Sequence, residues 1–227
     1  MDDPQVSLIS AIDGVHDYAV KLQRLHIGDR GLTVRSLLDH QQFSDPHGHA
    51  EARGISSANW SHFGQIWPAS VVLAEHMSTL PLRGRSVLEV GCGLAVPGLV
   101  LHQRGADVVV SDHHPECQPF LLENLRLNGL GPLSFLDVDW SAANPQLGMF
   151  DMLIASDVLY ERGHPTELVG FFERHALPRA EVLVVDPRRS QAGEFNRRMQ
   201  ASGFARSADP MPSAAGYRII HYQRGAA

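Results

Sequence analysis

The sequence predicts an α/β fold with a mostly parallel sheet of seven strands, an antiparallel terminal β-hairpin and a further β-hairpin in an N-terminal extension. Three observations lead to this fold. From Arg85 onward, short β-branched runs alternate with helical segments over about 140 residues, which is typical of βαβ units with helices on both faces of a parallel sheet. The first of these strands runs into a glycine-rich turn. Two strands joined by a loop containing Pro and Gly close the chain.

The length of 227 residues and the apolar content of 44% allow one sizeable domain with an extension. We divide the chain into an N-terminal β-hairpin and loop extension, 1–59, and an α/β domain, 60–227. No apolar run approaches the roughly 18 residues that span a membrane, and the acidic start at Met1 is not a signal peptide. The net charge of −6 argues against a nucleic-acid surface. Cys92 and Cys117 lack metal-ligand spacing and indicate a reducing, cytoplasmic environment.

The chain has 13 histidines, and the pairs His47/His49 and His113/His114 suggest metal ligands at first sight. Neither pair has the helical i, i+4 spacing or the neighbouring cysteines of a metal site. We therefore expect loop or surface histidines and no metal.

The N-terminal extension contains two runs in which apolar and polar residues alternate, 19–27 and 32–38. A four-residue loop, 28–31, separates them, so the pattern predicts a β-hairpin. The His-, Gly- and Asp-rich stretch 39–57 predicts an irregular loop. Apolar residues at helical spacing then predict a helix over 66–80, with a proline in its first turn.

The α/β domain is predicted from the alternation of buried strands and helices. The strands are expected at 86–91, 107–111, 133–136, 150–156, 181–186, 204–208 and 217–223. The helices are expected at 97–104, 115–128, 165–176 and 190–202. Ligands of such sheets bind at the carboxyl ends of the parallel strands, so the candidate site residues are those that follow each strand.

The run from Ser86 to Gly98 is a buried strand, a glycine turn and a helix N-terminus. This Rossmann-like unit is suited to hold the polar part of a nucleotide-like cofactor with backbone N–H groups. A dinucleotide fingerprint needs a small residue at Val96, where helix and strand touch, but the next glycine comes two residues later, after Pro97. The spacing therefore disfavours a nicotinamide-dependent oxidoreductase.

Acidic and aromatic residues follow the next strands. Asp112 lies about 20 residues past the glycines, where a carboxylate accepts both hydroxyls of a ribose; otherwise it caps the turn that follows. The indole of Trp140 is placed to cover an adenine face, or else it closes the edge of the sheet. Trp67, which leads into the helix at 66–80, is either a further ligand contact or a core residue.

The segment Ser156-Asp157-Val-Leu-Tyr160 follows the fourth strand. A carboxylate at Asp157 can hold a substrate amine, and the ring of Tyr160 can stabilise a developing cation through its face. The alternatives are that Asp157 caps the following helix and that Tyr160 belongs to the core. Arg188 and Arg189, after the fifth strand, either contact an acidic substrate or lie in solvent.

These motifs resemble those of class I methyltransferases, which use S-adenosylmethionine (SAM). The glycine run G-x-G-x-x-x-P-G resembles their first motif. The order W-P, V-L-E-V-G-C-G, S-D, E-N-L-R-L-N, D-W and S-D-V-L-Y, over about residues 60–186, is similar to methyltransferase family 16. That family has a D-x-x-Y motif, and many of its characterised members methylate lysines of specific proteins. His113-His114-Pro115 and Asp186-Pro-Arg-Arg189 look like a bacterial subgroup.

The resemblance implies that 60–227 is a class I SAM-dependent methyltransferase domain, with S-adenosylhomocysteine as the product of the cofactor. It implies Asp157 and Tyr160 as catalytic residues. The implied cofactor-binding residues are Trp67, Glu89, Gly91, Cys92, Gly93, Asp112, His113, Trp140 and Ser156. Of these, Cys92 is expected to pack within the turn, with no redox role.

The expected reaction is N-methylation of a lysine, or of another side-chain amine, in a protein substrate. Neither a nucleic-acid nor a membrane partner is expected. A small-molecule N- or O-methyltransferase is the first alternative. A non-catalytic SAM-binding regulatory protein is the second.

Overall fold

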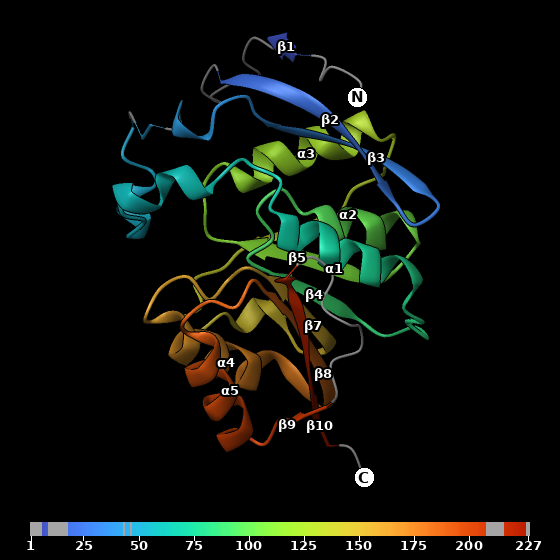
Figure 1. Ribbon diagram of the computed structural model, residues 1–227, viewed down its shortest axis with the longest axis vertical. Helices are drawn as coiled ribbons and strands as arrows, with labels where there is room; N and C mark the ends of the chain where they lie inside the picture. Colours follow the sequence, from blue (N-terminus) through green and yellow to red (C-terminus); the bar gives the residue numbers. More distant parts are fainter. Residues whose placement is uncertain (1–5, 9–17, 43, 46, 208–215, 226–227) are drawn as a thin grey trace.

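The computed structural model describes residues 6–8, 18–42, 44–45, 47–207 and 216–225, which form a layered α/β core with a small separate sheet on one side (Figure 1). The strands of the small sheet are β1 (Val6–Leu8), β2 (Ala19–Ile27) and β3 (Arg30–Leu37). The strands of the large sheet are β4 (Val87–Val90), β5 (Val108–Asp112), β6 (Ser134–Asp137), β7 (Phe150–Ser156), β8 (Ala176–Asp186), β9 (Ala205–Arg206) and β10 (Arg218–Arg224). The α-helices are α1 (Pro68–Thr79), α2 (Val96–Gln103), α3 (Cys117–Leu127), α4 (His164–His175) and α5 (Ala192–Ala201). The short 3₁₀ helices are η1 (His40–Gln42), η2 (Glu51–Arg53), η3 (Ser57–His62) and η4 (Pro145–Leu147).

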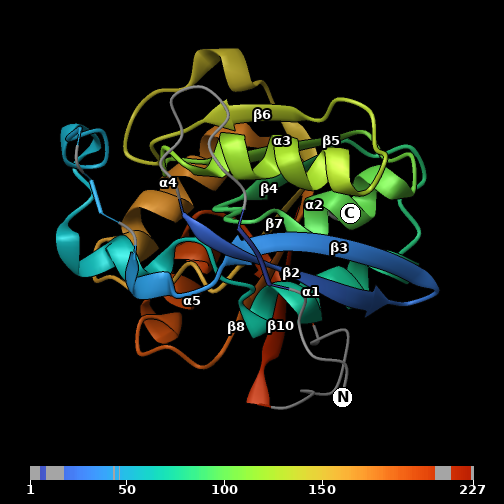
Figure 2. The same cartoon turned by 90° about the horizontal axis from the view of Figure 1, so that it is seen from above.

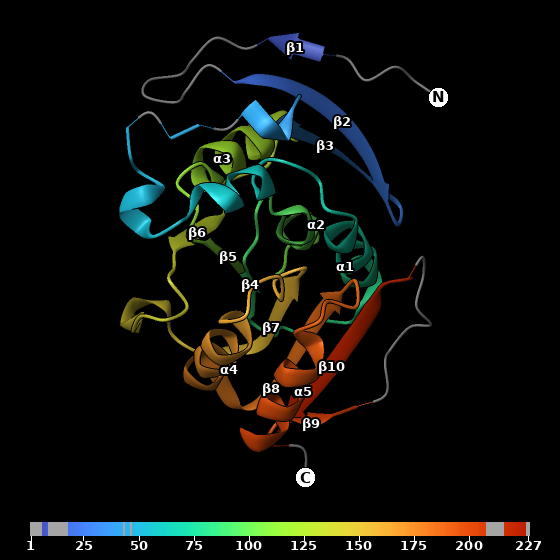
Figure 3. The same ribbon diagram turned by 60° about the vertical axis from the view of Figure 1, so that its left-hand side comes forward.

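The large sheet has the strand order β6-β5-β4-β7-β8-β10-β9. The pairs among β4 to β8 are parallel, whereas β10 pairs antiparallel with both β8 and β9. Helices α1, α2 and α3 cover one face of the sheet, and α4 and α5 cover the other (Figure 3). The predicted fold class is therefore confirmed: a Rossmann-like seven-stranded sheet with antiparallel C-terminal strands and an N-terminal β-hairpin.

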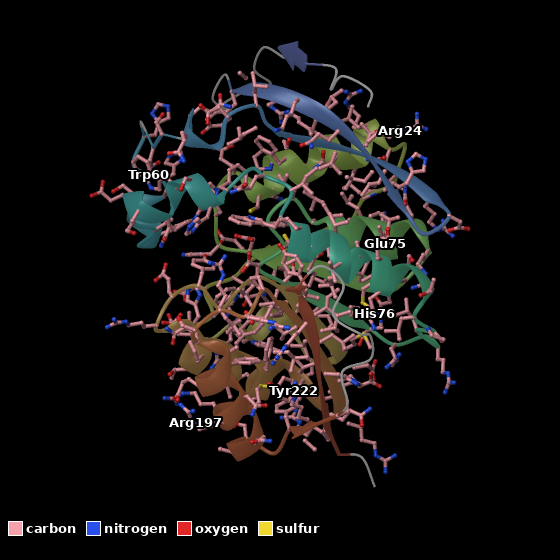
Figure 4. The ribbon with its side chains drawn as sticks, in the orientation of Figure 1. Arg24, Trp60, Glu75, His76, Arg197 and Tyr222 are labelled. Atoms are coloured by element: carbon pink, nitrogen blue, oxygen red, sulfur yellow. The ribbon has the colours of Figure 1, made fainter. Side chains whose placement is uncertain are left out.

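Alternate residues of the central strands enter two hydrophobic clusters. In β7, Ile154 belongs to the cluster with α1 to α3, whereas Leu153 belongs to the cluster with α4 and α5. On that second side, Tyr222 of β10 lies beneath α5, with its ring centroid 5.8 Å from that of Phe195 (Figure 4). Strand β4 is buried at all of its positions. The apolar runs that predicted these strands thus reflect a sheet covered on both faces.

Strands β2 and β3 form the predicted N-terminal hairpin, with Ile27 paired to Arg30. The connection is a two-residue turn, Gly28-Asp29, rather than the predicted four-residue loop. Gly28 has a φ of +59°, and glycine at the first position of a two-residue turn gives a backbone twist that matches the strands. Strand β1, which the sequence analysis did not predict, pairs antiparallel with β2.

The hairpin is attached to the large domain through the edge of β3 that faces α3, and it lies across the helical layer (Figure 2). The N–H of Arg35 donates to Asn124 Oδ1 at 2.7 Å, and the N–H of Thr33 donates to Asn128 Oδ1 at 2.8 Å. Asn128 Nδ2 donates to the carbonyl of Thr33 at 2.7 Å. The two asparagines are one helical turn apart, about 6 Å, and alternate strand residues are about 7 Å apart, so the two spacings match.

Most other elements lie within a few residues of their predicted positions. The clearest difference is β8, which begins at Ala176 instead of 181 and shifts its register with β7 between Phe150 and Met152. The stretch predicted as an irregular loop contains η1, η2 and the start of η3. The last residue of the strand predicted at 204–208 and most of the loop after it, together 208–215, fall outside the described residues. No helix in the part of the chain that the structure describes is long and apolar enough to cross a membrane.

Candidate functional site

A cavity of about 400 Å³ lies where the parallel strands of the large sheet end. Its floor is formed by residues at or just after the ends of β4, β5, β6 and β7, the position expected from the sheet topology. Its outer wall comes from the stretch 53–70, which contains η3 and the start of α1. The structure brings together all but one of the predicted site residues, namely Trp67, Gly91, Cys92, Gly93, Asp112, His113, Trp140, Ser156, Asp157 and Tyr160.

The glycine turn after β4 packs against a ring at one position and faces open space at another. Gly91 has a φ of +65°, and a Cβ there would lie 2.9 Å from Val158 Cγ1 and 3.1 Å from a ring carbon of Trp140. Gly93 has a φ of +53°, and a Cβ there would meet no atom within 4 Å. Because Gly93 also lines the cavity, the turn leaves room for a ligand beside its backbone.

Asp112 ends β5 and holds the glycine turn with its carboxylate. Oδ2 accepts a hydrogen bond from Gly93 N at 2.8 Å, and Oδ1 accepts one from His114 N at 2.9 Å. The turn-capping contact that the sequence analysis kept as an alternative is therefore present. Each carboxylate oxygen has a second lone-pair site, so hydroxyl groups in the cavity can bind at the same time.

Glu89, the predicted site residue that does not line the cavity, lies beneath the glycine turn. It is 1% exposed, and its Oε2 accepts a hydrogen bond from Gly98 N at 2.7 Å. Burial, with a smaller effect of Asp112, raises the pKa of this carboxyl to about 8. Cys92 does line the cavity, but burial raises the pKa of its thiol well above the ordinary value. Glu89 thus supports the turn from below, and Cys92 packs as a neutral thiol.

His113 joins the outer wall of the cavity to its floor. Its Nδ1 lies 2.9 Å from Asp137 Oδ1, and its Nε2 lies 3.1 Å from the carbonyl oxygen of Arg53. Arg53 Nη2 donates to Asp137 Oδ2 at 2.9 Å. Both ring nitrogens of His113 are engaged by protein groups, so neither is available to hydrogen-bond a ligand.

Five rings follow one another along the cavity, in the order Trp67, His62, Tyr160, His164 and Trp140. Neighbouring ring centroids are 6.1, 4.9, 4.5 and 5.2 Å apart, and each pair is edge-to-face. This arrangement brings the positive edge of one ring to the negative face of the next. The sequence predicts the tryptophans and the tyrosine as site residues but not the two histidines, because no spacing along the chain connects them.

Asp157 follows β7 with a φ of +56°, which is unusual for a residue other than glycine. Its N–H donates to the carbonyl of Val185 at 2.9 Å. Arg189 Nε and Nη2 donate to its two carboxylate oxygens at 2.8 and 3.0 Å, and the Asp157 side chain is only 8% exposed. From the sequence, Arg189 is expected either to contact a substrate or to lie in solvent. The structure shows it as the partner of Asp157.

The rings beside Asp157 are uncharged at neutral pH. Burial, followed by the charge of Arg189, lowers the pKa of His62. Burial, followed by the charge of Asp112, raises the pKa of Tyr160. Tyr160 is 40% exposed, so it forms part of the rim by which a substrate can enter.

The other histidine pair noted in the sequence lies away from the cavity floor. The rings of His47 and His49 have centroids 5.8 Å apart. Over the described ranges of the chain, no group of three or more His, Cys, Asp or Glu side chains is placed to hold a metal ion.

Comparison with models of known protein families matches residues 56–202 to methyltransferase family 16, described as lysine methyltransferase. The matched region runs from the outer wall of the cavity to the end of α5. It therefore contains every predicted site residue.

Among curated proteins, the histone-arginine methyltransferase METTL23 of Homo sapiens is 30% identical over 132 residues, which cover 52% of this chain and 66% of that protein. The electron transfer flavoprotein beta subunit lysine methyltransferase of Mus musculus is 28% identical over 141 residues, which cover 59% of this chain and 53% of that protein. The histidine protein methyltransferase 1 homolog of Dictyostelium discoideum is 27% identical over 118 residues, covering 49% and 38%. The chain thus spans less than two thirds of the length of these relatives.

Among solved structures, a T. thermophilus 16S rRNA methyltransferase bound to AdoMet and guanosine has a TM-score of 0.61 at 19% identity, covering 90% of this chain and 50% of that chain. The magnesium protoporphyrin IX methyltransferase from Synechocystis with bound SAM has a TM-score of 0.57 at 17% identity, covering 81% and 98%. At these identities the likeness concerns the fold alone.

Proposed function

The chain belongs to the lysine methyltransferase family of class I SAM-dependent methyltransferases, and on this premise we propose that it methylates a side-chain nitrogen of a protein, with lysine as the first candidate. The proposal depends above all on Asp157. It is a nearly buried carboxylate in a left-handed turn at the end of β7, on the wall of the cavity. A strained backbone at such a position is typical of functional sites.

The residues of the cavity fit SAM. Gly93 leaves space beside the turn, so that a ligand can lie against its backbone, whereas the N–H of Gly98 in the first turn of α2 is taken by Glu89. Asp112 has lone pairs for two ribose hydroxyls, and the Trp140 ring that packs on Gly91 is placed to cover the adenine. We assign direct contacts to these residues and to Trp67 and Ser156. Supporting roles are assigned to Glu89, Cys92 and His113.

When bound, SAM supplies an electrophilic methyl group on a sulfonium. The residues of the chain then have to position and desolvate the acceptor nitrogen. Each oxygen of Asp157 accepts one hydrogen bond from Arg189 and keeps a lone pair for an N–H of the acceptor. Tyr160 and His62 border this position and offer ring faces to a nitrogen that becomes positive. The released proton passes to solvent at the exposed rim.

An acceptor on the surface of a protein is favoured by the rim of the cavity. Tyr160 and the neighbouring Glu161 are both exposed, so a protruding side chain can reach Asp157 from outside. The names of the relatives describe enzymes acting on arginine, lysine and histidine, which are all nitrogen acceptors. Lysine is our first candidate because it is the acceptor in the family description. Arginine is the second, because of the similarity to METTL23.

The test is incubation of the protein and methyl-labelled SAM with lysate from a strain that lacks it. We expect label in a protein band, methyl-lysine after hydrolysis, and loss of most of the label with Asp157→Asn. Label confined to the small-molecule fraction would contradict the protein acceptor and favour a small-molecule N- or O-methyltransferase. SAM binding without label in any fraction would favour a non-catalytic SAM-binding protein.

Three further parts of the proposal concern the whole chain. We place it in a bacterial subgroup on the basis of the segments 113–115 and 186–189. We keep the division into an extension, 1–59, and a methyltransferase domain, 60–227. We also keep a reducing, cytoplasmic location, since both cysteines are free thiols.

A further inference from the structure

A second cavity, of about 290 Å³, lies beside the first, and Arg189 borders both. Its walls come from the turn after β8, the first turn of α5 and strand β10. Four arginines line it, namely Arg188, Arg189, Arg206 and Arg218. In a chain with a net charge of −6, this local concentration of cations creates a positive field that attracts anions.

Two of these arginines have no side-chain partner among the residues that the structure describes. Arg189 is engaged by Asp157, whereas Arg188 and Arg218 form no ion pair or side-chain hydrogen bond with the residues that the structure describes. Arg218 is exposed and lies opposite Asp186 in the β8–β10 pair. Arg188 has a φ of +67°, a second left-handed residue close to the first cavity. The N-terminal turn of α5 adds the positive end of a helix dipole.

The floor of the second cavity contains a buried acceptor. Asp186 is 1% exposed, and its Oδ2 accepts a hydrogen bond from Arg189 N at 3.0 Å. Its Oδ1 is buried and receives no hydrogen bond from the described part of the chain. Such an atom is costly unless a ligand or water supplies a donor. A bare anion supplies none and is repelled by the carboxylate, whereas a peptide offers both an N–H and an acidic side chain.

We propose that the second cavity binds an acidic segment of the acceptor protein, next to the side chain that is methylated. This inference rests on the proposed function. A carboxylate of the segment pairs with Arg188 and Arg218, and a backbone N–H reaches Asp186 Oδ1. Because Arg189 borders both cavities, the carboxylate of the bound segment competes with the Asp157 carboxylate for the guanidinium of Arg189. Binding of the correct segment thereby frees oxygen lone pairs of Asp157 for the acceptor nitrogen.

Peptide binding to the full-length protein saturated with S-adenosylhomocysteine tests this proposal. The probe is a fluorescein-labelled ten-residue peptide that alternates Glu with Ser, and the comparison peptide has Gln in place of Glu. By fluorescence polarisation we expect the glutamate peptide to bind at least about fivefold more tightly, as one or two partly exposed ion pairs allow. Arg218→Gln should remove most of this preference, and the double variant with Arg188→Gln should remove all of it.

The matched control is Arg179→Gln, which makes the same charge change at an exposed position near the opposite end of β8. It should keep the preference within about twofold, as expected for a surface substitution far from the site. Thermal unfolding of each variant shows that it is folded. Equal losses in Arg218→Gln and Arg179→Gln would overturn the proposal. Tighter, Arg218-dependent binding of an RNA hexanucleotide would overturn it in favour of nucleic acid.

Peptide binding needs no methyl transfer, so the proposed peptide site and the proposed methylation of a protein are tested separately. If a protein in the lysate is methylated but peptide binding does not depend on Arg218, only the proposal of a peptide site in the second cavity is rejected. Arg218-dependent peptide binding with no methylated protein supports the second cavity as a peptide site and rejects the methylation of a protein.

Discussion

At the residue scale, Asp157 has a left-handed backbone and a carboxylate that binds Arg189. One substitution removes the carboxylate and keeps the backbone conformation. Asparagine tolerates a left-handed backbone at least as well as aspartate, whereas alanine does not. Asp157→Asn therefore keeps the turn after β7 and removes the carboxylate. We expect SAM affinity within a few-fold of the wild type and loss of most methyl transfer, because the partner of Asp157 is the acceptor. Calorimetric titration and turnover measure the two quantities, and full turnover would leave Asp157 with a role in the turn only.

The ribose contact is tested at Asp112. Asp112→Ala should weaken SAM binding by about 2–4 kcal/mol, because charge-assisted hydrogen bonds are lost. The control is Asp107→Ala, an exposed aspartate just before β5 at its other end. Since Asp112 also holds Gly93 and His114, thermal unfolding has to be measured beside calorimetric titration. Unchanged SAM affinity in the alanine variant would remove the ribose assignment.

Glu89 predicts a pH dependence of stability. In the folded chain its pKa is raised from the ordinary 4.5 to about 8. In the unfolded chain the carboxyl ionises near its ordinary pKa, so raising the pH from about 5 to 8 favours unfolding, and stability present at low pH is lost. Glu89→Gln cannot ionise and should flatten this part of the curve. Urea unfolding from pH 5 to pH 8 measures it, with the exposed Glu173→Gln as control. Parallel curves for Glu89→Gln and the wild type would contradict the prediction.

At the element scale, the turn after β4 shows why its glycine spacing differs from a dinucleotide fingerprint. Ala95 has a φ of +57° and precedes α2, which begins at Val96. The close contact between helix and strand falls at Gly98, where a Cβ would clash with Val110 and with Glu89 Oε2. Gly98 therefore has the packing role of the third glycine in a dinucleotide fold, two residues later along the chain.

The contact between β3 and α3 predicts a stability effect without an effect on the cofactor. Asn124→Ala leaves the buried N–H of Arg35 without its acceptor, which should cost about 1–3 kcal/mol of unfolding free energy. SAM affinity should not change, because Asn124 lies outside the cavity. Urea unfolding and calorimetric titration measure both quantities. Gln118→Ala, at an exposed position of the same helix, is the control. Equal stability of the two variants would show that the Asn124 contact is not needed for docking.

At the scale of the whole molecule, the N-terminal hairpin and the large domain share one hydrophobic core. Val20 and Val34 of the hairpin are fully buried in the same cluster as Leu73 of α1 and Phe120 of α3. The guanidinium of Arg35 lies 4.3 Å from the centroid of the Phe120 ring. Full burial of such aliphatic side chains is worth about 1.5–3 kcal/mol each. The hairpin therefore contributes to the stability of the domain on which it lies.

Deletion of residues 1–58 should consequently lower the Tm and weaken SAM binding along with methyl transfer. The deletion exposes the apolar side of α3 and removes part of the cavity wall. Differential scanning fluorimetry and calorimetric titration measure the two effects. The control is Arg53→Gln in the full-length chain, which removes the wall contact to Asp137 and keeps the hairpin. A truncated protein that unfolds at the Tm of the full-length chain would show that the domain is stable without the hairpin.

The sequence by itself determined most of the elements and the place of the site, because both depend on local patterns. Strand β7 lies at the predicted residues, 150–156, since a short apolar run and its boundaries can be read from neighbouring residues. The order of strands and helices then implies a parallel sheet, whose strand ends must meet. Gly91, Asp112 and Ser156 could therefore be assigned to one cavity from their positions in the sequence alone.

Only the tertiary structure decided which side chains face one another at that cavity. Arg189 reaches Asp157 from a different strand end, and His62 comes from the outer wall to lie against Tyr160. Of the asparagines of the E-N-L-R-L-N motif, Asn124 lies in α3 and Asn128 directly follows it, and their partners lie on β3, far away in sequence. Such contacts depend on how loops and elements pack, and they leave no period in the sequence. For this reason the positions of the site residues were predictable from the sequence, whereas the partners of Asp157 and Asn124 were not.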